Sequence, residues 1–184
     1  DRQEVTAEIP YLSIKGQRGI ADAVLGTKYK FLSEEHALIG VAGSFEVKLD
    51  KGDQSEELGS GAIDYDFRLR FQKTWRWFTG IANAGYTFVG EPEVDGTRQK
   101  RQDVLFFAFA QEYKITERFK LLSEIYWKNS DELHVPHRFA GDIGFKYRLL
   151  PNIDIHAAIG ESLREGNLGG PQLRVYAGTK IEFP

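Results

Sequence analysis

Residues 63–72 read IDYDFRLRFQ, in which apolar and polar side chains alternate without a break. A strict period of two predicts a β-strand with one apolar face and one polar face. If the apolar face is inside, the chain is a water-soluble sandwich or barrel. If the apolar face is outside, the chain lies in a membrane and its charged side chains line a lumen. The direction of the apolar face therefore decides the class of protein.

Segments with the same period recur along the whole chain, and they predict ten strands and no helix. The strands are expected roughly at 4–14, 19–32, 36–49, 60–73, 76–89, 102–115, 118–129, 137–149, 152–162 and 172–183. The connections between them alternate in length. Short turns are expected at 32–35, 73–76, 115–118 and 150–152, and longer loops at 15–19, 51–61, 90–101, 129–137 and 163–170. All short turns, and with ten strands both termini, are therefore expected at one end of the structure.

This separation of turns and loops is typical of an up-and-down outer-membrane barrel, which has short periplasmic turns and long extracellular loops. Most expected strands exceed the five or six residues usual in globular proteins, and a tilted membrane strand needs about 9 to 11. Aromatic residues close to the short turns would form an interfacial girdle: Tyr29, Phe31, Phe71, Tyr113, Phe119, Tyr147 and Phe183. The sequence therefore predicts an all-β fold, an antiparallel up-and-down transmembrane β-barrel of about ten strands, in one domain over residues 1–184.

The two faces of the expected strands differ in composition. One face is almost free of charge and is expected to meet lipid, with Phe67 and Phe145 on it and Gln111 as its clearest exception. The opposite face mixes charged residues with small ones such as Gly26 and Gly144, which suits a crowded interior. The charged residues predicted to line the lumen are Asp22, Lys28, Asp64, Asp66, Arg68, Arg70, Glu112, Glu124, Arg138, Asp142, Lys146, Arg148, Arg174 and Glu182. A soluble ligand-binding barrel with the faces reversed is the alternative.

Composition removes several other classes of protein. The net charge of -3 gives no electrostatic support for a nucleic-acid partner. The chain has no cysteine, so it has no disulfide, no thiolate metal site and no cysteine nucleophile. The longest charge-free run is the 14 residues from Trp77 to Gly90, which is too short for a transmembrane helix. Because the chain starts at Asp1 without a signal peptide, we interpret it as a mature or trimmed product.

Four stretches can be compared with known barrels: GIADAVLGTKYKFL (19–32), GSGAIDY (59–65), NAGYTFVGEP (83–92) and VLFFAFAQEYKITERFKLLSEIYW (104–127). In this order they resemble the bacterial outer-membrane proteins grouped as the MetA-pathway of phenol degradation transporters. The resemblance implies a Gram-negative outer-membrane barrel linked by name to the catabolism of aromatic compounds. Members of that family have a further strand pair before the stretch that matches residues 8–13. The resemblance therefore implies twelve strands if an N-terminal hairpin is missing, and ten if the barrel closes as it stands.

Two motifs on the polar face have both a functional and a structural interpretation. Asp22 and Lys28, in the motif GxxDxxxGxKY, could belong to a solute path, but a cross-strand ion pair beside glycines is the stronger interpretation. The ladder Asp64, Asp66, Arg68, Arg70 could bind an anionic solute, because arginine presents a planar fork that suits carboxylates. Charge compensation within the wall explains the same ladder equally well.

The loop NSDELHVPH (129–137) is where enzyme-like residues gather: Asp131, Glu132, His134 and His137. The two histidines are separated by Pro136, so no helical register supports a metal site, and exposed charged loops are usually only solvated. We therefore expect no enzymatic activity, no catalytic residue, no metal and no cofactor.

Three functional hypotheses follow from this sequence. The first is an outer-membrane barrel that acts as a narrow channel or uptake porin for small solutes, including aromatic acids. The second is a structural or anchoring barrel with an occluded lumen, whose extracellular loops bind a protein partner. The third, less favoured, is an enzyme at the rim. The expected partners are membrane lipid and lipopolysaccharide, a small-molecule solute and a protein at the loops, and no nucleic acid. The expected location is the bacterial outer membrane.

Overall fold

The structure, a computed structural model, describes residues 2–14, 17–52, 58–94, 96–133, 135–164 and 173–181. Within these ranges the chain forms strands and no helix, and therefore no helix able to cross a membrane. The strands are β1 (Gln3–Glu8), β2 (Tyr11–Ile14), β3 (Gln17–Ile20), β4 (Ala23–Leu32), β5 (Gly40–Leu49), β6 (Asp64–Trp75), β7 (Phe78–Phe88), β8 (Glu93–Val94), β9 (Thr97–Arg98), β10 (Val104–Lys114), β11 (Phe119–Lys128), β12 (Arg138–Leu150), β13 (Ile153–Arg164) and β14 (Leu173–Ile181).

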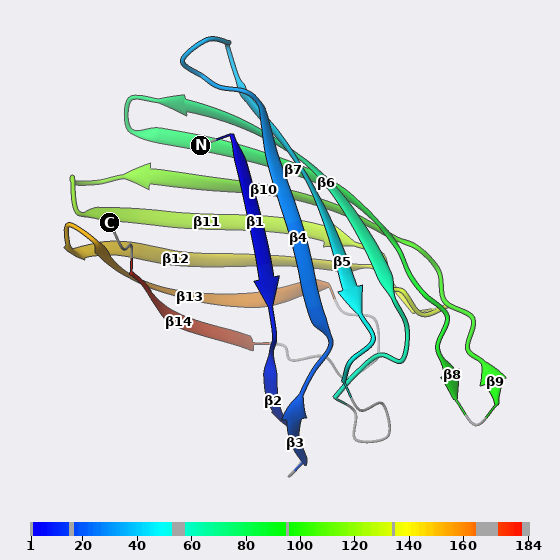
Figure 1. Cartoon of the computed structure of the whole chain (residues 1–184). Coiled ribbons are helices and arrows are strands. Elements are labelled where there is room, and N and C mark those ends of the chain that lie inside the picture. The colour runs from blue at the N-terminus through cyan, green and yellow to red at the C-terminus, as the bar shows by residue number, and fades with distance from the viewer. Residues whose placement is uncertain are drawn as a thin grey trace.

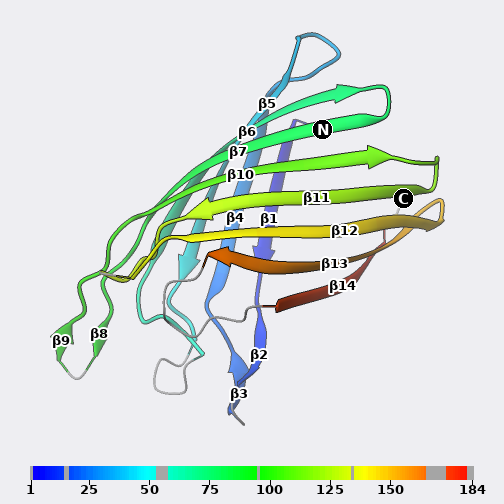
Figure 2. The ribbon, with the colours of Figure 1, turned by 180° about the vertical axis from the view of Figure 1, so that it is seen from behind.

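Ten of these strands form one antiparallel sheet in the order β1-β4-β5-β6-β7-β10-β11-β12-β13-β14. Each strand of the sheet pairs with the strand of the same sheet that follows it along the chain. This is the up-and-down order predicted from the sequence. The sheet bends round a central space, so that β1, β4 and β5 cross in front of β11 to β14 in one view and behind them in the other (Figures 1 and 2). The edge strands of the described sheet are β1 and β14. The carboxylate of Glu4 on β1 lies within electrostatic range of Lys180 on β14.

The two ends of the sheet differ as the sequence predicts. The connections β6–β7 and β12–β13 have only two residues each, at 76–77 and 151–152, while the opposite end carries connections such as 50–63 and 129–137. The first residues of β1 pair with the last residues of β4, and the last residues of β14 pair with the first residues of β13. The outer ends of β1 and β14 therefore lie on the short-turn side.

The structure differs from the prediction at three connections. The expected strand 4–14 is interrupted at Pro10, which has no N–H to give to a partner. The ribbon continues beyond Pro10 as the hairpin β2–β3, and a second hairpin, β8–β9, extends from the 89–103 connection. The turn after β4 is longer than expected, because the N–H groups of His36 and Ala37 both donate to the carbonyl of Ser33 and β5 starts only at Gly40.

The apolar face of the sheet points outward. Phe67 and Phe145 are 47% and 37% exposed, and no large side chain of the described residues is fully buried. The buried apolar cluster consists of only three residues, Ala108, Tyr126 and Ala140. A soluble barrel would bury its apolar face instead, so the reversed arrangement is wrong.

Aromatic residues lie near both ends of the outer face. At the short turns, Trp75, Trp77, Phe78 and Tyr113 contact one another, with ring centroids 5.1 to 6.0 Å apart. Near the long loops, Phe88 contacts the rings of Phe67 and Tyr86, and Trp127 contacts Phe107 and His137. Of the first group the sequence predicted only Tyr113 for the interfacial girdle, and it predicted none of the second group there.

Candidate functional site

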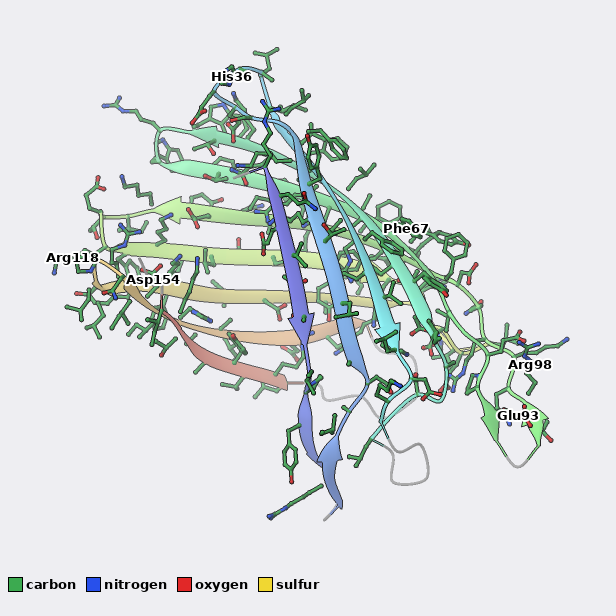
Figure 3. All side chains as sticks on the ribbon, viewed as in Figure 1. His36, Phe67, Glu93, Arg98, Arg118 and Asp154 are labelled. Carbon is green, nitrogen blue, oxygen red and sulfur yellow. The ribbon has the colours of Figure 1, made fainter. Side chains whose placement is uncertain are left out.

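The candidate site is the inner face of the sheet, where the register brings the charged residues of successive strands into rows. Arg68 stands opposite Ser44 and Gly85, and Asp142 stands opposite Glu124 and Gly160. Figure 3 shows side chains on both faces of every strand of the sheet. The predicted lumen residues that fall on inner-face positions of the strands are Lys28, Asp64, Asp66, Arg68, Arg70, Glu112, Glu124, Arg138, Asp142, Lys146, Arg148 and Arg174. Glu182 lies outside the described residues.

Arg68 and Asp66 form an ion pair within β6. The Nε of Arg68 donates to Oδ1 of Asp66 at 2.7 Å, and the hydroxyl of Thr87 donates to Oδ2 at 2.6 Å. One row nearer the long loops, Nζ of Lys48 lies 2.5 Å from Oδ2 of Asp64. Both aspartates of the ladder are therefore neutralised by neighbouring cations, as the structural interpretation of the ladder predicts.

Three further ion pairs, made by two acids, occupy the inner face toward the short turns. Lys120 on β11 lies 2.6 Å from Glu112 on β10. Asp154 on β13 accepts from both Lys146 and Arg148 of β12, at 2.8 and 3.4 Å. The place of Asp154 in the alternating pattern puts it on the same face as Lys146.

Arg174 on β14 reaches across three strands. Its Nη2 lies 2.8 Å from Oδ1 of Asp142 on β12, and its Nη1 donates to the hydroxyl of Tyr126 on β11. Gly160 of β13 stands between the two charged residues in the row, and a Cβ at that position would lie 1.5 Å from the Asp142 carboxylate. The missing side chain at Gly160 therefore gives Asp142 and Arg174 the space in which they meet, and this reach shows that the face is concave.

A similar arrangement occurs at Arg68, another arginine of the wall. The guanidinium of Arg68 lies 5.1 Å from the ring centroid of Phe106 on β10, and Gly85 of β7 stands between them. Phe106 contacts Tyr126, whose ring lies 5.2 Å from the guanidinium of Arg174. These two aromatic residues sit on the charged face, where the alternation would predict polar ones, so the sequence analysis missed them.

Three of the predicted lumen residues form no ion pair within the described part of the chain, although Arg70 lies within electrostatic range of Glu4. Arg70 donates only to the side-chain oxygen of Gln72, at 3.3 Å. Arg138 and Glu124 make no ion pair with a described residue, although Asp142 and Arg174 lie within electrostatic range of Glu124. Arg68 and Arg174 therefore pair with acids of the wall, whereas Arg70 and Arg138 form no ion pair with a described residue.

A polar cavity of about 390 Å³ lies beside Arg70, toward the short-turn end. It is formed by β4, β5, β6 and the turn after β4: Lys28, Lys30, Leu32, Ser33, Glu34, Glu35, Gly40, Val41, Ala42, Arg70 and Gln72. Lys28 is paired with Glu4 of β1 at 3.0 Å, whereas the side chain of Lys30 has no hydrogen bond or ion pair in the described residues. The sequence analysis did not single out Lys30.

Asp22 differs from the other predicted lumen residues, because it holds a loop. Its carboxylate is almost fully buried and accepts from the N–H groups of Lys51, Gly52 and Ser60, at 3.1, 2.9 and 2.7 Å, and from the Ser60 hydroxyl at 2.8 Å. Burial opposes ionisation, but the donors at Ser60 and Gly52 outweigh it and hold the pKa of Asp22 below its ordinary value. Lys28 pairs with Glu4 at 3.0 Å and Asp22 lies 3.9 Å from Nζ of Lys48, so both residues form cross-strand ion pairs, but not with each other.

The 129–137 connection is tied to its neighbour rather than arranged as a catalytic cluster. Nη1 of Arg101 lies 3.2 Å from Asp131 and 3.0 Å from Glu132. His137 stacks on Trp127, with ring centroids 5.1 Å apart, and His134 lies outside the described residues. No group of three metal-ligating side chains is present in the part of the chain that the structure describes.

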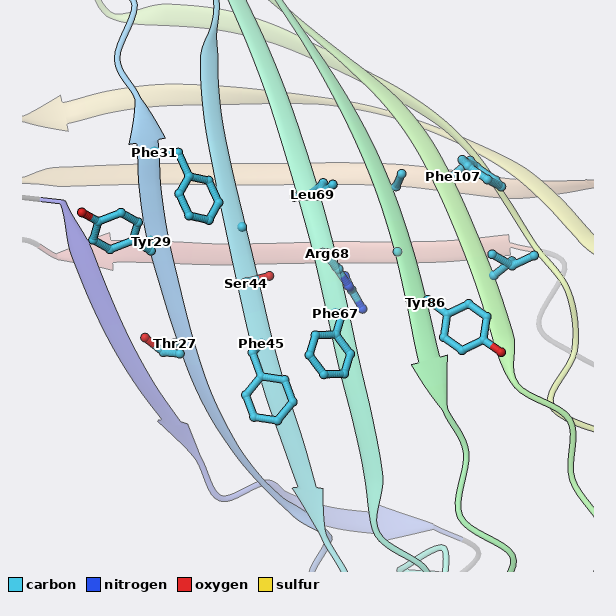
Figure 4. A pocket seen from close by; sticks show the side chains of 14 residues that line it. Thr27, Tyr29, Phe31, Ser44, Phe45, Phe67, Arg68, Leu69, Tyr86 and Phe107 are labelled. Carbon is cyan, nitrogen blue, oxygen red and sulfur yellow. The ribbon is translucent and has the colours of Figure 1, made fainter.

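The outer face has an apolar groove of about 650 Å³ across β4, β5, β6, β7 and β10. Its floor includes Gly43, where a Cβ would lie 2.8 Å from the ring of Phe31. The aromatic walls of the groove, Tyr29, Phe31, Phe45, Phe67, Tyr86 and Phe107, are labelled in Figure 4. The groove therefore belongs to the apolar exterior and not to the charged inner face.

These features together define a porin-like β-barrel fold, with an up-and-down sheet, an apolar exterior and a charged concave face. In agreement, the solved NanC porin in a rhombohedral crystal form matches with a TM-score of 0.65, covering 99% of this chain and 94% of that chain. The two sequences are only 12% identical, so this similarity concerns the fold alone.

The sequence family is a separate finding. The chain belongs to the family described as "Protein of unknown function (DUF3187)", which matches residues 5–165. No curated protein matches the chain. The family match does not test the resemblance to the phenol-degradation transporters.

Proposed function

We propose that this protein is a non-enzymatic barrel of the bacterial outer membrane that provides a narrow channel for small solutes. The observation behind the proposal is the inversion of the two faces of β6. Phe67 is 47% exposed on the outside, while its neighbours Asp66 and Arg68 pair with each other on the concave side. In water this arrangement would expose a large apolar surface, and in a bilayer the same surface is solvated by lipid.

Two further features support a membrane setting. The aromatic groups near the short turns and near the long loops lie where the two interfaces of a bilayer would be, as expected of interfacial girdles. The outer groove of about 650 Å³ is apolar, and acyl chains of lipid or lipopolysaccharide would fill it. The short turns would then be periplasmic and the long loops extracellular.

The proposed channel is narrow. A barrel of eight strands is filled by its own side chains, whereas 16 to 18 strands enclose an aqueous channel. The inner face of this ten-stranded sheet bears ion pairs between neighbouring strands, and the pair between Arg174 and Asp142 reaches over an intervening strand. Passage is therefore proposed for small solutes only, and aromatic acids are candidates through the resemblance to the phenol-degradation transporters.

Single-channel recording in planar bilayers tests this function. We expect small, discrete conductance steps for the purified protein, well below those of a wide porin. Substitution of Arg174 by alanine should raise the conductance, because it removes a side chain that spans three strands. Arg98→Ala, on the exposed hairpin β8–β9, is the matched control and should leave the conductance unchanged. A barrel that inserts into the bilayer but never conducts would instead favour the structural barrel whose loops bind a protein partner.

A further inference from the structure

The inner face of the sheet is richer in cations than in acids, although the whole chain has a net charge of -3. The register places these cations on it: Lys28, Lys30, Lys48, Arg68, Arg70, Lys114, Lys120, Lys128, Arg138, Lys146, Arg148, Arg174 and Lys180. Among the described residues, the acids on the same face are fewer: Glu4, Glu8, Glu46, Asp64, Asp66, Glu112, Glu124, Asp142 and Asp154. A concave wall with this imbalance attracts anions.

The imbalance is concentrated at the polar cavity near the short turns. Lys30 on β4 and Arg70 on β6 are both opposite Ala42 of β5, so they flank a small residue in one row. Neighbouring strands lie about 4.8 Å apart, which places the two backbones roughly 10 Å from each other. Two long cationic side chains across such a gap can both reach one carboxylate lying over Ala42.

The other charges around this cavity are largely compensated. Lys28 is paired with Glu4 at 3.0 Å, and Glu4 also lies within electrostatic range of Arg70. Glu34 accepts from the N–H and hydroxyl of Thr74, at 2.7 and 3.0 Å, and lies 3.9 Å from Lys73. Glu35 is exposed on the turn and is the one lining acid without such partners in the described residues. The two cations Lys30 and Arg70 therefore face one uncompensated acid.

We propose that Lys30 and Arg70 form a binding site for the carboxylate group of a small organic acid. This inference rests on the proposed function, because it places the site on the path of the permeating solute. Arginine offers a planar pair of donors and lysine a mobile point charge, so the carboxylate is held by charge-assisted hydrogen bonds from both sides. The cavity of about 390 Å³ has room for an acid of the size of benzoate.

Binding is tested by isothermal titration of the detergent-solubilised protein with sodium benzoate, sodium acetate and the neutral analogue benzyl alcohol. Both carboxylates should bind, and benzyl alcohol should not. The double substitution Lys30→Gln and Arg70→Gln should weaken benzoate binding about tenfold or more, since each hydrogen bond to a charged group contributes substantially. Glu35→Gln should strengthen it, because the substitution removes the opposing acid.

A matched control removes the same number of cations from elsewhere. Arg98→Gln with Lys100→Gln changes two exposed residues on the long-loop side and should leave benzoate binding unchanged. Equal binding by the wild type and the Lys30, Arg70 double variant would overturn the site, and so would equal binding of benzoate and benzyl alcohol. Conductance recorded on the same samples separates the two proposals: benzoate binding without any conductance refutes the channel, and conductance without benzoate binding refutes the site.

Discussion

A charge placed at Phe67 tests the orientation of the sheet most directly. Phe67 is the central member of an outward-facing apolar series. The series starts at Ile63, one residue before β6, takes every second residue up to Phe71 and ends before Lys73. With a rise of about 3.4 Å per residue and a strand tilt of about 40°, each residue advances about 2.6 Å along the membrane normal. The series is then about 21 Å long, so Phe67 lies near the middle of the bilayer and Phe71 about 10 Å closer to the short-turn interface.

The expected cost depends on this depth. An arginine on the lipid face of a barrel costs about 2–4 kcal/mol at the midplane and about 0–1 kcal/mol near an interface. Phe67→Arg should therefore lower the free energy of unfolding by about 2–3 kcal/mol more than Phe71→Arg. Phe67 also loses ring contacts with Phe45 and Phe88, at centroid distances of 4.7 and 6.0 Å. Phe67→Leu measures that contribution separately, since it keeps the position apolar.

Urea unfolding of the protein in phospholipid vesicles, followed by the fluorescence of its three tryptophans, gives these free energies. The slope of the free energy against urea should stay the same in all variants if the comparison is valid. If the outer face met water, a surface arginine would change stability by no more than about 0.5 kcal/mol at either position. Equal and small effects at Phe67 and Phe71 would therefore refute the membrane orientation.

Three other predictions follow from the contacts of the wall and loops. Asp22→Ala should leave the N–H groups of Gly52 and Ser60 without their acceptor, destabilise the loop by about 1–3 kcal/mol and speed amide exchange at both positions. The pKa of Asp22 is depressed in the folded state, so the stability that its carboxylate contributes is complete above the ordinary pKa of 3.8. That stability is lost as the pH falls through the lower pKa of the folded state. Both amides should therefore stay protected from exchange at pH 5. Gly160→Ala should displace Asp142 and lower the unfolding free energy by about 1.5–3 kcal/mol in a urea titration, whereas Gly85→Ala, whose tightest contact would be the flexible Arg68 side chain at 3.1 Å, should cost less. Protease added to intact cells should cut within 90–101 and spare 151–152, and the opposite pattern would reverse the proposed orientation.

The ten strands of the sheet could be predicted from sequence because a half-exposed strand has a strict period of two. The series in β6 shows this best, since each residue from Asp64 to Phe71 lies on the face that the alternation assigns. The interruptions were harder to predict. Pro10 breaks a ribbon whose alternation continues through it, and the turn at 33–39 is set by hydrogen bonds to the Ser33 carbonyl that no period records.

The partners of the inner-face residues could be predicted only in part. Alternation assigns each charge to a face, but the pairing depends on the register between strands, which the sequence leaves open. Asp22 is an example, because its motif with Lys28 suggested an ion pair, whereas its hydrogen-bond donors are loop groups of Lys51, Gly52 and Ser60, 29 to 38 residues further along the chain. Lys30 is another example. It shares a row with Arg70 because the register places both residues opposite Ala42.

The small residues of the inner face connect these observations. In a flat sheet, a glycine between two charged residues would only weaken the strand. On a concave face, side chains from alternate strands converge, and a missing side chain lets them meet above it. Gly160 does so for Asp142 and Arg174, and Gly85 does so for Arg68 and its aromatic neighbour. Ala42 separates Lys30 and Arg70 in the same way, but there the two side chains have like charge. Like charges held around an open position favour an anion between them, and this is why the proposed carboxylate site lies at Ala42 rather than at either glycine.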